Sequence, residues 1–306
     1  MKKVTIIGAG NVGATLGFIL GLQNVCDVIV LLDIEDGVPK GKALDMMHAM
    51  PLFNSKSKFI GTKDYEDTED SEVVVITAGI PRKPGMSRDD LLTTNVRIIE
   101  EITDKIVEYS PDTKIIVVTN PLDVTTYAAY KKSGLEKNKV MGMAGVLDSA
   151  RFRAHILEKI DAEPEKVKAL VLGTHGDTMV PIIGQSSIND KELNETIPMD
   201  KINAISERVK QSGAEVVSLM KDGSAYYAPA SATAEMVRAI LNDEKKILPC
   251  SCLLEGEYEI DGIFLGVPAV IGKEGVERIE EIELTTEENK LLMKSAQHVK
   301  EQLEKL

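Results

Sequence analysis

The sequence predicts an α/β protein, with a doubly wound parallel sheet over residues 1–145 followed by an α+β domain over residues 146–306. In the first half, short apolar runs alternate with longer segments of helical spacing, which is typical of strands buried on both faces by flanking helices. In the second half, pairs of short apolar runs are joined by tight connections, and long helical patterns lie around them. A chain of 306 residues is long enough for two domains of ordinary size.

Each element is expected from its own local pattern. Four apolar runs in the first half are expected to be strands, at residues 4–7, 28–32, 73–76 and 115–118, and helical spacing is found at 11–22, 38–50 and 89–109. In the second half we expect paired strands at 169–172 with 180–183 and at 246–254 with 263–270, and helices at 148–160, 199–221, 230–241 and 285–306. No linker rich in Pro, Gly or Ser lies near residue 145, so the two domains are expected to form one rigid unit.

Charge and composition exclude several classes of protein. The net charge of −13 argues against non-specific binding to nucleic acid or to an anionic membrane. An anionic small substrate is still compatible with it, because a local cluster of Arg can oppose the overall sign. With 43% hydrophobic and 28% charged residues, the chain is typical of a folded soluble protein.

The three cysteines and the N-terminal segment indicate a cytoplasmic protein. Cys26 is isolated, and Cys250 and Cys252 are too close in sequence to bridge comfortably, so we expect reduced thiols. No second Cys or His pair accompanies them, and no metal site is expected. The apolar stretch at residues 4–22 is interrupted by Asn11 and five glycines, unlike a signal peptide, and no run reaches the ~18 apolar residues of a membrane span.

A glycine-rich segment after the first strand run predicts a dinucleotide site. The segment has the pattern G-x-G-x-x-G and consists of Gly8, Ala9, Gly10, Asn11, Val12 and Gly13. It follows a strand, opens a helix, and is followed by Asp33 at the end of the second strand, which is the context of the Rossmann-type fingerprint. The helix N-terminus would bind the phosphates, and Asp33 would bind the ribose hydroxyls and repel a 2′-phosphate, which favours NAD over NADP. The alternative is a glycine-rich turn without a ligand.

Two further segments follow strand runs, where a parallel sheet binds its ligands. Residues 77–88 form a Gly- and Pro-containing loop that carries Arg82, Lys83 and Arg88. Asn120 ends the fourth run, where its amide could bind both cofactor and substrate, and Pro121 is expected in the first turn of the next helix. The alternatives are a solvated basic loop and an Asn that caps that helix.

The second half supplies the candidate acid and base. Asp148 and Arg151 are three residues apart on a predicted helix and therefore share a face. His175 has a glycine one residue after it and another two residues before it, in a turn between two strands, which gives it access and backbone freedom. We therefore expect His175 to transfer a proton, with Asp148 fixing its tautomer. The alternatives are a surface ion pair and a histidine that only packs.

Together these segments resemble the lactate/malate dehydrogenase family over essentially the whole chain. The resemblance is carried by G-I-P-R-K-P-G-M-S-R-D-D-L (79–91), V-T-N-P-L-D (118–123), L-D-S-A-R-F-R (147–153) and G-T-H-G-D (173–177), and it is nearest to the malate-specific enzymes of the lactate-dehydrogenase-like type. It implies a cofactor domain followed by a substrate domain. It also implies a homo-oligomer, for which a tetramer is favoured over a dimer.

The resemblance also implies a role for each site residue. His175 is the proton donor and acceptor, oriented by Asp148, and Arg151 binds the carboxylate next to the reacting carbon. Arg88 polarises the reacting carbonyl, and Asn120 contacts the substrate. Asn95 and Val118, like the glycine-rich segment and Asp33, line the cofactor site.

Arg82 is the position that selects the substrate in this family. Lactate-specific members carry Gln there and tend to carry Thr where this chain has Ala225, so the resemblance implies a dicarboxylate substrate. The implied reaction is the reversible oxidation of (S)-malate by NAD⁺ to oxaloacetate. The alternatives are a lactate or broad-specificity 2-hydroxy-acid dehydrogenase and, in another class, a non-catalytic NAD-binding sensor or structural protein.

Overall fold

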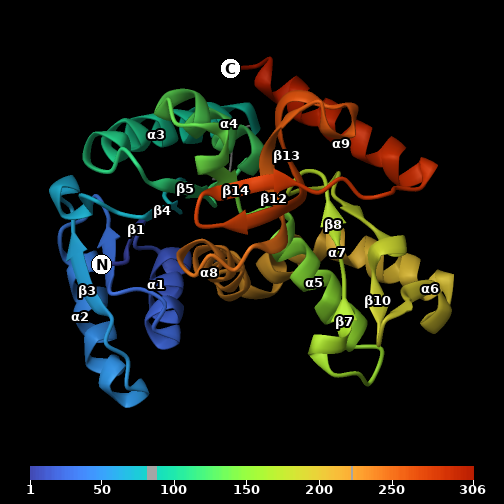
Figure 1. Cartoon of the computed structure of the whole chain (residues 1–306), viewed down its shortest axis with the longest axis horizontal. Helices are drawn as coiled ribbons and strands as arrows, with labels where there is room; N and C mark the ends of the chain where they lie inside the picture. The colour runs from blue at the N-terminus through green and yellow to red at the C-terminus, as the bar shows by residue number, and fades with distance from the viewer. Residues whose placement is uncertain (81–87, 222) are drawn as a thin grey trace.

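The computed structural model describes residues 1–80, 88–221 and 223–306, except for the side chain of Arg88 (Figure 1). Six parallel strands of the first half form the larger part of its main sheet. They are β1 (Lys3–Ile7), β2 (Val28–Leu32), β3 (Lys58–Thr62), β4 (Val73–Ile76), β5 (Lys114–Val117) and β6 (Val140–Gly142). They lie in the order β3-β2-β1-β4-β5-β6, so the sheet grows in opposite directions from β1 and β4. This is the order of doubly wound dinucleotide-binding sheets, and it confirms the predicted fold class.

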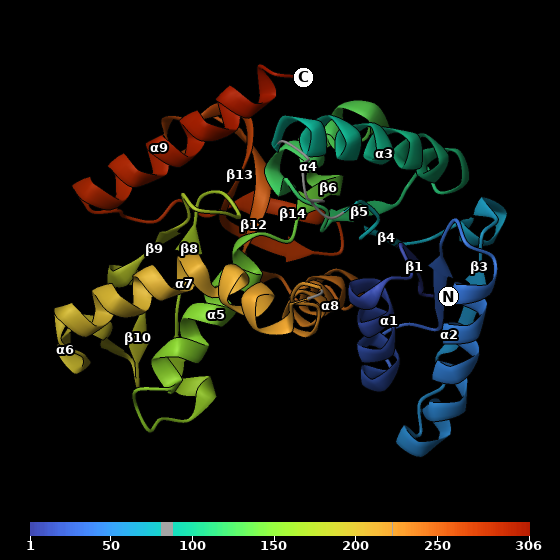
Figure 2. The same cartoon turned by 180° about the vertical axis from the view of Figure 1, so that it is seen from behind.

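Helices cover both faces of this sheet (Figures 1 and 2). The first-half helices are α1 (Asn11–Gln23), α2 (Gly37–Ala49), α3 (Arg88–Tyr109) and α4 (Leu122–Ser133). Side chains of a strand point alternately to its two faces. In β4, Val73 and Val75 therefore join the core beneath α1, whereas Val74 and Ile76 join the core beneath α3 and α4. Burial on both faces explains why these strands read as uninterrupted apolar runs.

The second half is α+β, as predicted. Its helices are α5 (Gly145–Leu157), α6 (Leu193–Thr196), α7 (Met199–Met220), α8 (Tyr227–Leu241) and α9 (Thr286–Leu303). Its strands are β7 (Val167–Lys168), β8 (Val171–Leu172), β9 (Val180–Pro181), β10 (Ser187–Ile188), β11 (Lys191–Glu192), β12 (Lys246–Glu255), β13 (Asp261–Gly272) and β14 (Gly275–Ile279). The predicted pairs β8–β9 and β12–β13 are both antiparallel hairpins.

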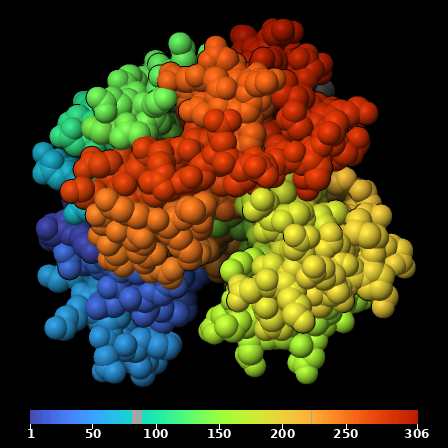
Figure 3. Space-filling model, turned by 45° about the vertical axis from the view of Figure 1, so that its right-hand side comes forward, coloured from blue at the N-terminus to red at the C-terminus, as the bar shows by residue number. Residues whose placement is uncertain are grey.

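The two halves share one sheet, which the sequence patterns do not predict. In the described residues, nine strands are continuous in the order β14-β13-β12-β6-β5-β4-β1-β2-β3. The connection between the halves is antiparallel, with Ser251 of β12 opposite Gly142 of β6. The hairpin therefore extends the parallel sheet at the edge opposite β3, and α8 packs against α1 (Figure 3).

Some bounds differ from the predictions for local physical reasons. The strand β6 has only three residues, and the edge strand β3 alternates buried and exposed positions, so neither forms an apolar run. The helical pattern at 38–50 continues beyond α2 as a 3-10 turn, Met50–Phe53. Pro121 is the N-cap of α4 and does not lie inside its first turn, and the Asn120–Pro121 peptide bond is cis.

Thr285 begins the C-terminal helix with a capping box. Its hydroxyl accepts the Glu288 N–H at 3.2 Å, and the Glu288 carboxylate accepts the Thr285 N–H at 2.9 Å. The same carboxylate accepts the Ile183 N–H at 3.1 Å, which ties α9 to the segment after β9. The three cysteines are buried and free. Within the described ranges, no helix has the length and hydropathy needed to cross a bilayer.

Candidate active site

The glycine-rich segment forms a narrow cradle where β1 meets α1. A Cβ at Gly8, where φ is +103°, would lie 2.7 Å from Thr77 Oγ1, and a Cβ at Gly13 would lie 1.9 Å from the Gly8 carbonyl oxygen. A Cβ at Gly10 would meet no atom within 4 Å. Close packing of the protein thus requires glycine at positions 8 and 13, whereas Gly10 leaves open space above the backbone.

The N-terminus of α1 is available to an anion. No side chain caps it, and its first turn contains no acidic residue, so backbone N–H groups and the positive end of the helix dipole face outward. Asp33 stands beside this turn at the end of β2, where its Oδ2 accepts the Ala9 N–H at 2.7 Å. No described residue donates to its Oδ1. Lys42 donates to the Ala9 carbonyl at 2.6 Å and so holds the segment from the other side.

A cavity of about 600 Å³ lies over this cradle, within the range of small-molecule sites. It is lined by Gly8, Gly10, Asp33, the segment 77–80 after β4, and Ile98, Glu101 and Lys105 of α3. The residues present fit a dinucleotide: an open cradle and helix N-terminus for phosphates, and for a ribose the carboxylate of Asp33, whose Oδ1 accepts no hydrogen bond from the described residues. The residues predicted from the fingerprint are therefore brought together.

Asn95 joins the carboxyl ends of β4 and β5. It is 2% exposed, and its amide group accepts the Ile80 N–H at 2.9 Å and donates to the Ile80 carbonyl at 3.2 Å and the Asn120 carbonyl at 2.8 Å. The described hydrogen bonds of Asn95 are thus all with the segments that follow β4 and β5. Direct contact of Asn95 and of the buried Val118 with the cofactor stays a prediction.

The predicted acid–base pair is formed by elements of the second half. Asp148 in the first turn of α5 is 1% exposed, and its Oδ2 lies 2.8 Å from His175 Nδ1. A carboxylate only accepts hydrogen bonds, so Nδ1 carries the proton and Nε2 of the neutral ring is left as the acceptor. Arg151 donates to the other oxygen, Oδ1, at 3.3 Å, and its guanidinium lies against α7 near Gly213.

The electrostatic environment of His175 favours a protonated ring. Burial alone would lower the pKa of His175, but the charge of Asp148 and its hydrogen bond outweigh burial and raise the pKa above its ordinary value. Arg151 opposes this rise, and Asp123 contributes to it. The ring can therefore hold a proton near neutral pH and release it as the pH rises.

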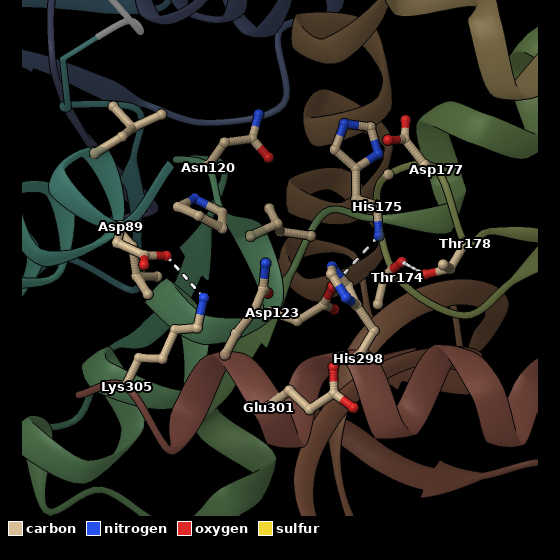
Figure 4. Close-up of a pocket in the computed structure, with 16 residues that line it drawn as sticks. Asp89, Asn120, Asp123, Thr174, His175, Asp177, Thr178, His298, Glu301 and Lys305 are labelled. Atoms are coloured by element: carbon tan, nitrogen blue, oxygen red, sulfur yellow. Dashed lines mark hydrogen bonds and ion pairs between the residues drawn. The ribbon is translucent and has the colours of Figure 1, made fainter. Parts of the chain in front are cut away.

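Two buried contacts fix the turn that carries His175. Ser295 of α9 accepts the Thr174 N–H at 2.8 Å. Asp123 Oδ2 accepts the His175 N–H at 3.3 Å (Figure 4). Asp123 lies in the first turn of α4, is 5% exposed, and also accepts the Ser251 hydroxyl at 2.6 Å. In the sequence, Asp123 is part of the V-T-N-P-L-D motif but resembles an ordinary acidic residue near a helix start, so the pattern predicts no role for it.

Asn120 and His175 line a second cavity of about 550 Å³ (Figure 4). The start of α3, the start of α4, the His175 turn and the C-terminal part of α9 surround it. Lys305, two residues beyond the end of α9, pairs with Asp89 of α3 at 2.9 Å across one end. Arg82 and the side chain of Arg88 lie outside the described residues, so their predicted places at this cavity are untested. Over the described residues, no group of His, Cys, Asp and Glu side chains could hold a metal ion.

A glycine-lined crevice at the point where the strand order reverses, combined in one chain with a buried histidine–carboxylate pair, is typical of nicotinamide-dinucleotide-dependent oxidoreductases. Residues 2–142 match the family model of the lactate/malate dehydrogenase NAD binding domain, and residues 145–306 match that of the lactate/malate dehydrogenase alpha/beta C-terminal domain. The chain belongs to the lactate/malate dehydrogenase family. Its cofactor is NAD, as predicted.

Individual relatives cover nearly the whole chain. The malate dehydrogenase of Geobacillus sp. (strain WCH70) is 50% identical over 301 residues, 98% of this chain and 96% of the relative. The malate dehydrogenase of Cytophaga hutchinsonii is 51% identical over 300 residues, again 98% and 96%.

Solved structures agree with the fold. The malate dehydrogenase from Salinibacter ruber has a TM-score of 0.95 at 48% identity, covering 99% of this chain and 97% of that one. The lactate dehydrogenase from Cryptosporidium parvum, solved with lactic acid and β-nicotinamide adenine dinucleotide, also has a TM-score of 0.95, at 42% identity and with coverage of 99% and 97%. The backbone is therefore common to malate and lactate enzymes, and the choice between the two substrates depends on individual side chains.

Proposed function

We propose that the chain is an NAD-dependent malate dehydrogenase, which transfers a hydride reversibly between (S)-malate and NAD⁺ to give oxaloacetate and NADH. The observation that carries the proposal is the 2.8 Å contact between His175 Nδ1 and the buried Asp148, with Arg151 on the same carboxylate. Relatives named malate dehydrogenase, about half identical over the whole chain, support the choice of substrate.

His175 takes the hydroxyl proton of malate on Nε2 in the oxidation and returns it in the reduction. Asp148 holds the productive tautomer and stabilises the imidazolium that forms. The nicotinamide ring, when bound, supplies the hydride acceptor or donor. Because the pair is buried, the attraction between the imidazolium and the carboxylate is screened less than it would be in water.

Arginine side chains bind and polarise the substrate in this proposal. Arg151 is suited to the carboxylate next to the reacting carbon, because its planar guanidinium can bind a carboxylate through two parallel hydrogen bonds. Asn120, at the end of β5, contacts the substrate, and Arg88 stabilises the charge that develops on the carbonyl oxygen during reduction. The Arg88 role rests on its position in the 79–91 motif alone.

Arg82 decides between a malate and a lactate enzyme. Oxaloacetate has a second carboxylate that pyruvate lacks, and an arginine facing pyruvate would have no partner. Leaving one member of a buried charged pair unpaired costs about 2–5 kcal/mol. At 1.4 kcal/mol per factor of ten, oxaloacetate should be preferred over pyruvate by about thirty-fold to several thousand-fold in kcat/KM.

The test is NADH oxidation with oxaloacetate and with pyruvate, in the wild type and in Arg82→Gln. The variant should lose most activity on oxaloacetate and gain some on pyruvate, whereas Lys83→Gln in the same segment is the matched control and should keep the wild-type ratio. A wild type that prefers pyruvate would identify a lactate dehydrogenase, the alternative that the Cryptosporidium structure makes reasonable. Turnover of neither acid would leave a non-catalytic NAD-binding protein.

Two further parts of the proposal concern the setting of the enzyme. We place it in the cytoplasm, in agreement with three buried, unpaired cysteines. We also expect a homotetramer. Light scattering after size exclusion measures the mass directly, and a dimer or a monomer would contradict this expectation.

A further inference from the structure

Asp123 is a second buried carboxylate at His175, and it contacts the main chain of this residue and not its ring. Asp148 binds the ring at Nδ1, whereas Asp123 accepts the main-chain N–H of the same residue at 3.3 Å. The other oxygen of Asp123 accepts the Ser251 hydroxyl at 2.6 Å. Asp123 thus joins α4 of the first half to two segments of the second half, the His175 turn and β12.

The charge of Asp123 depends on pH close to neutrality. Burial raises the pKa of Asp123 to about 6, against the lowering effects of the Ser251 hydrogen bond and of His175. Above that pH the carboxylate is charged and raises the pKa of His175. Among the described residues, the other charged or titratable groups around the pair are Asp148 and Arg151 of α5 and Asp177 of the same turn. Asp89 of α3, His298 and Glu301 of α9, and Lys305 beyond α9 line the same cavity.

We propose that Asp123 is a positioning residue for His175, which holds the main chain of the catalytic turn and adds a second negative charge that supports the imidazolium. The inference rests on the proposed function in one respect, the assignment of His175 as the proton-transferring group. Asp148 sets the tautomer of the ring in this arrangement, whereas Asp123 acts only through the backbone contact and through its field.

The direction of the effect follows from the charge. Without the negative charge of Asp123, the imidazolium is less stable and the pKa of His175 falls. Malate oxidation needs neutral His175 and increases with pH, whereas oxaloacetate reduction needs the imidazolium and decreases with pH. The pH profile of kcat/KM in each direction has a midpoint set by the pKa of His175. Both midpoints should therefore move to lower pH together. A residue with only a structural role would lower kcat at every pH and leave both midpoints in place.

Asp123→Asn isolates this charge. The amide oxygen can still accept the His175 N–H, and the NH₂ can donate to Ser251, whose hydroxyl can rotate to accept. We expect both kcat/KM midpoints to fall by about 0.5–1 pH unit, less than for a direct ring partner. The matched control is Glu301→Gln, which removes one charge from the exposed α9 wall of the same cavity and should move the midpoints by less than about 0.2 unit.

A direct readout of His175 separates this inference from the proposed function. The chain has four histidines, so the His175 ring signal in NMR can be assigned by its absence in His175→Asn. Its titration should shift to lower pH in Asp123→Asn, whether or not the protein turns over malate. If His175→Asn stays active, the proposed proton transfer fails. If it is inactive but Asp123→Asn shifts neither the NMR titration nor the kinetic midpoints, the role of Asp123 alone is overturned.

Ser251→Ala provides a second variant in case Asp123→Asn does not fold. It removes the hydrogen bond that lowers the pKa of Asp123, so Asp123 should become protonated at a higher pH than in the wild type. The pKa of His175 should then fall in this variant too. A His175 titration identical to that of the wild type would contradict the proposal.

Discussion

Replacing Asp148 with Asn changes the hydrogen-bond chemistry of the buried pair and little else. The side chain is 1% exposed and the two residues have nearly the same volume, so packing should be preserved. Arg151, 3.3 Å from Oδ1, can only donate, so the new amide must keep its oxygen on that side. The NH₂ group is thereby turned toward His175 Nδ1, at the 2.8 Å contact that Oδ2 makes in the wild type.

Two losses follow from that orientation. Nδ1 must accept the amide hydrogen, so the neutral ring carries its proton on Nε2 and can no longer take one from malate. The imidazolium also loses a contacting negative charge, which is worth about 1–3 pKa units, or roughly 1.4–4 kcal/mol. General acid–base catalysis contributes ~10²–10⁴-fold, and the same substitution in a Ser–His–Asp triad lowers kcat by about 10⁴. We expect kcat/KM to fall by about 10³–10⁴-fold in both directions.

The assay is steady-state NADH absorbance, with NADH fluorescence titration as the control for cofactor binding. Asp148→Asn should approach the activity of His175→Asn, and both should bind NADH nearly as the wild type does, because the cofactor cradle is built from other strands. A loss smaller than about tenfold would refute the tautomer argument. An equal loss of NADH affinity would show that the substitution disturbs the fold.

Two more predictions concern the cofactor cradle. Asp33→Ser should narrow the preference for NAD over NADP by about tenfold, since it removes the charge that would oppose a 2′-phosphate; an unchanged ratio of kcat/KM would mean that Asp33 does not face the ribose. Gly13→Ala should destabilise the fold by about 1–3 kcal/mol in thermal unfolding, because its Cβ would lie 1.9 Å from the Gly8 oxygen. A Cβ at Gly10 has open space, so Gly10→Ala should keep the wild-type stability while weakening NADH binding about tenfold. Equal losses of stability in Gly13→Ala and Gly10→Ala would contradict the assignment of Gly13 to packing and of Gly10 to cofactor binding.

The cofactor half was predictable because its signals are local. The turn at Gly8, the helix from Asn11 and the carboxylate at Asp33 lie close together in the sequence, and each apolar run is a complete strand. The strands β3 and β6 were missed, since Lys58–Thr62 is an edge strand with exposed positions between buried ones and Val140–Gly142 is too short to show a pattern. The neighbour of β6, β12, comes much later in the chain, and no local signal indicates that a hairpin of the second half completes the sheet of the first.

The catalytic turn was predictable only in part. The spacing of Asp148 and Arg151 places them on one helix face, and the glycines around His175 indicate an accessible turn. The contact between Asp148 and His175 was predicted only from the family resemblance, because no residue pattern indicates that α5 lies beside that turn. No local pattern assigned a role to Asp123, since its partners His175 and Ser251 are 52 and 128 residues away.

The pairing of Gly142 with Ser251 determines how the molecule can be divided. Fragments separated near residue 145 would each have an unpaired strand edge, β6 in one and β12 in the other, and both strands are largely buried in the intact chain. Such edges promote association with other chains. The cofactor half and the catalytic half are therefore not independent folding units. A chimaera of two relatives would have to match strand register at this seam, and would also have to bring Asp123 from one parent to His175 and Ser251 from the other.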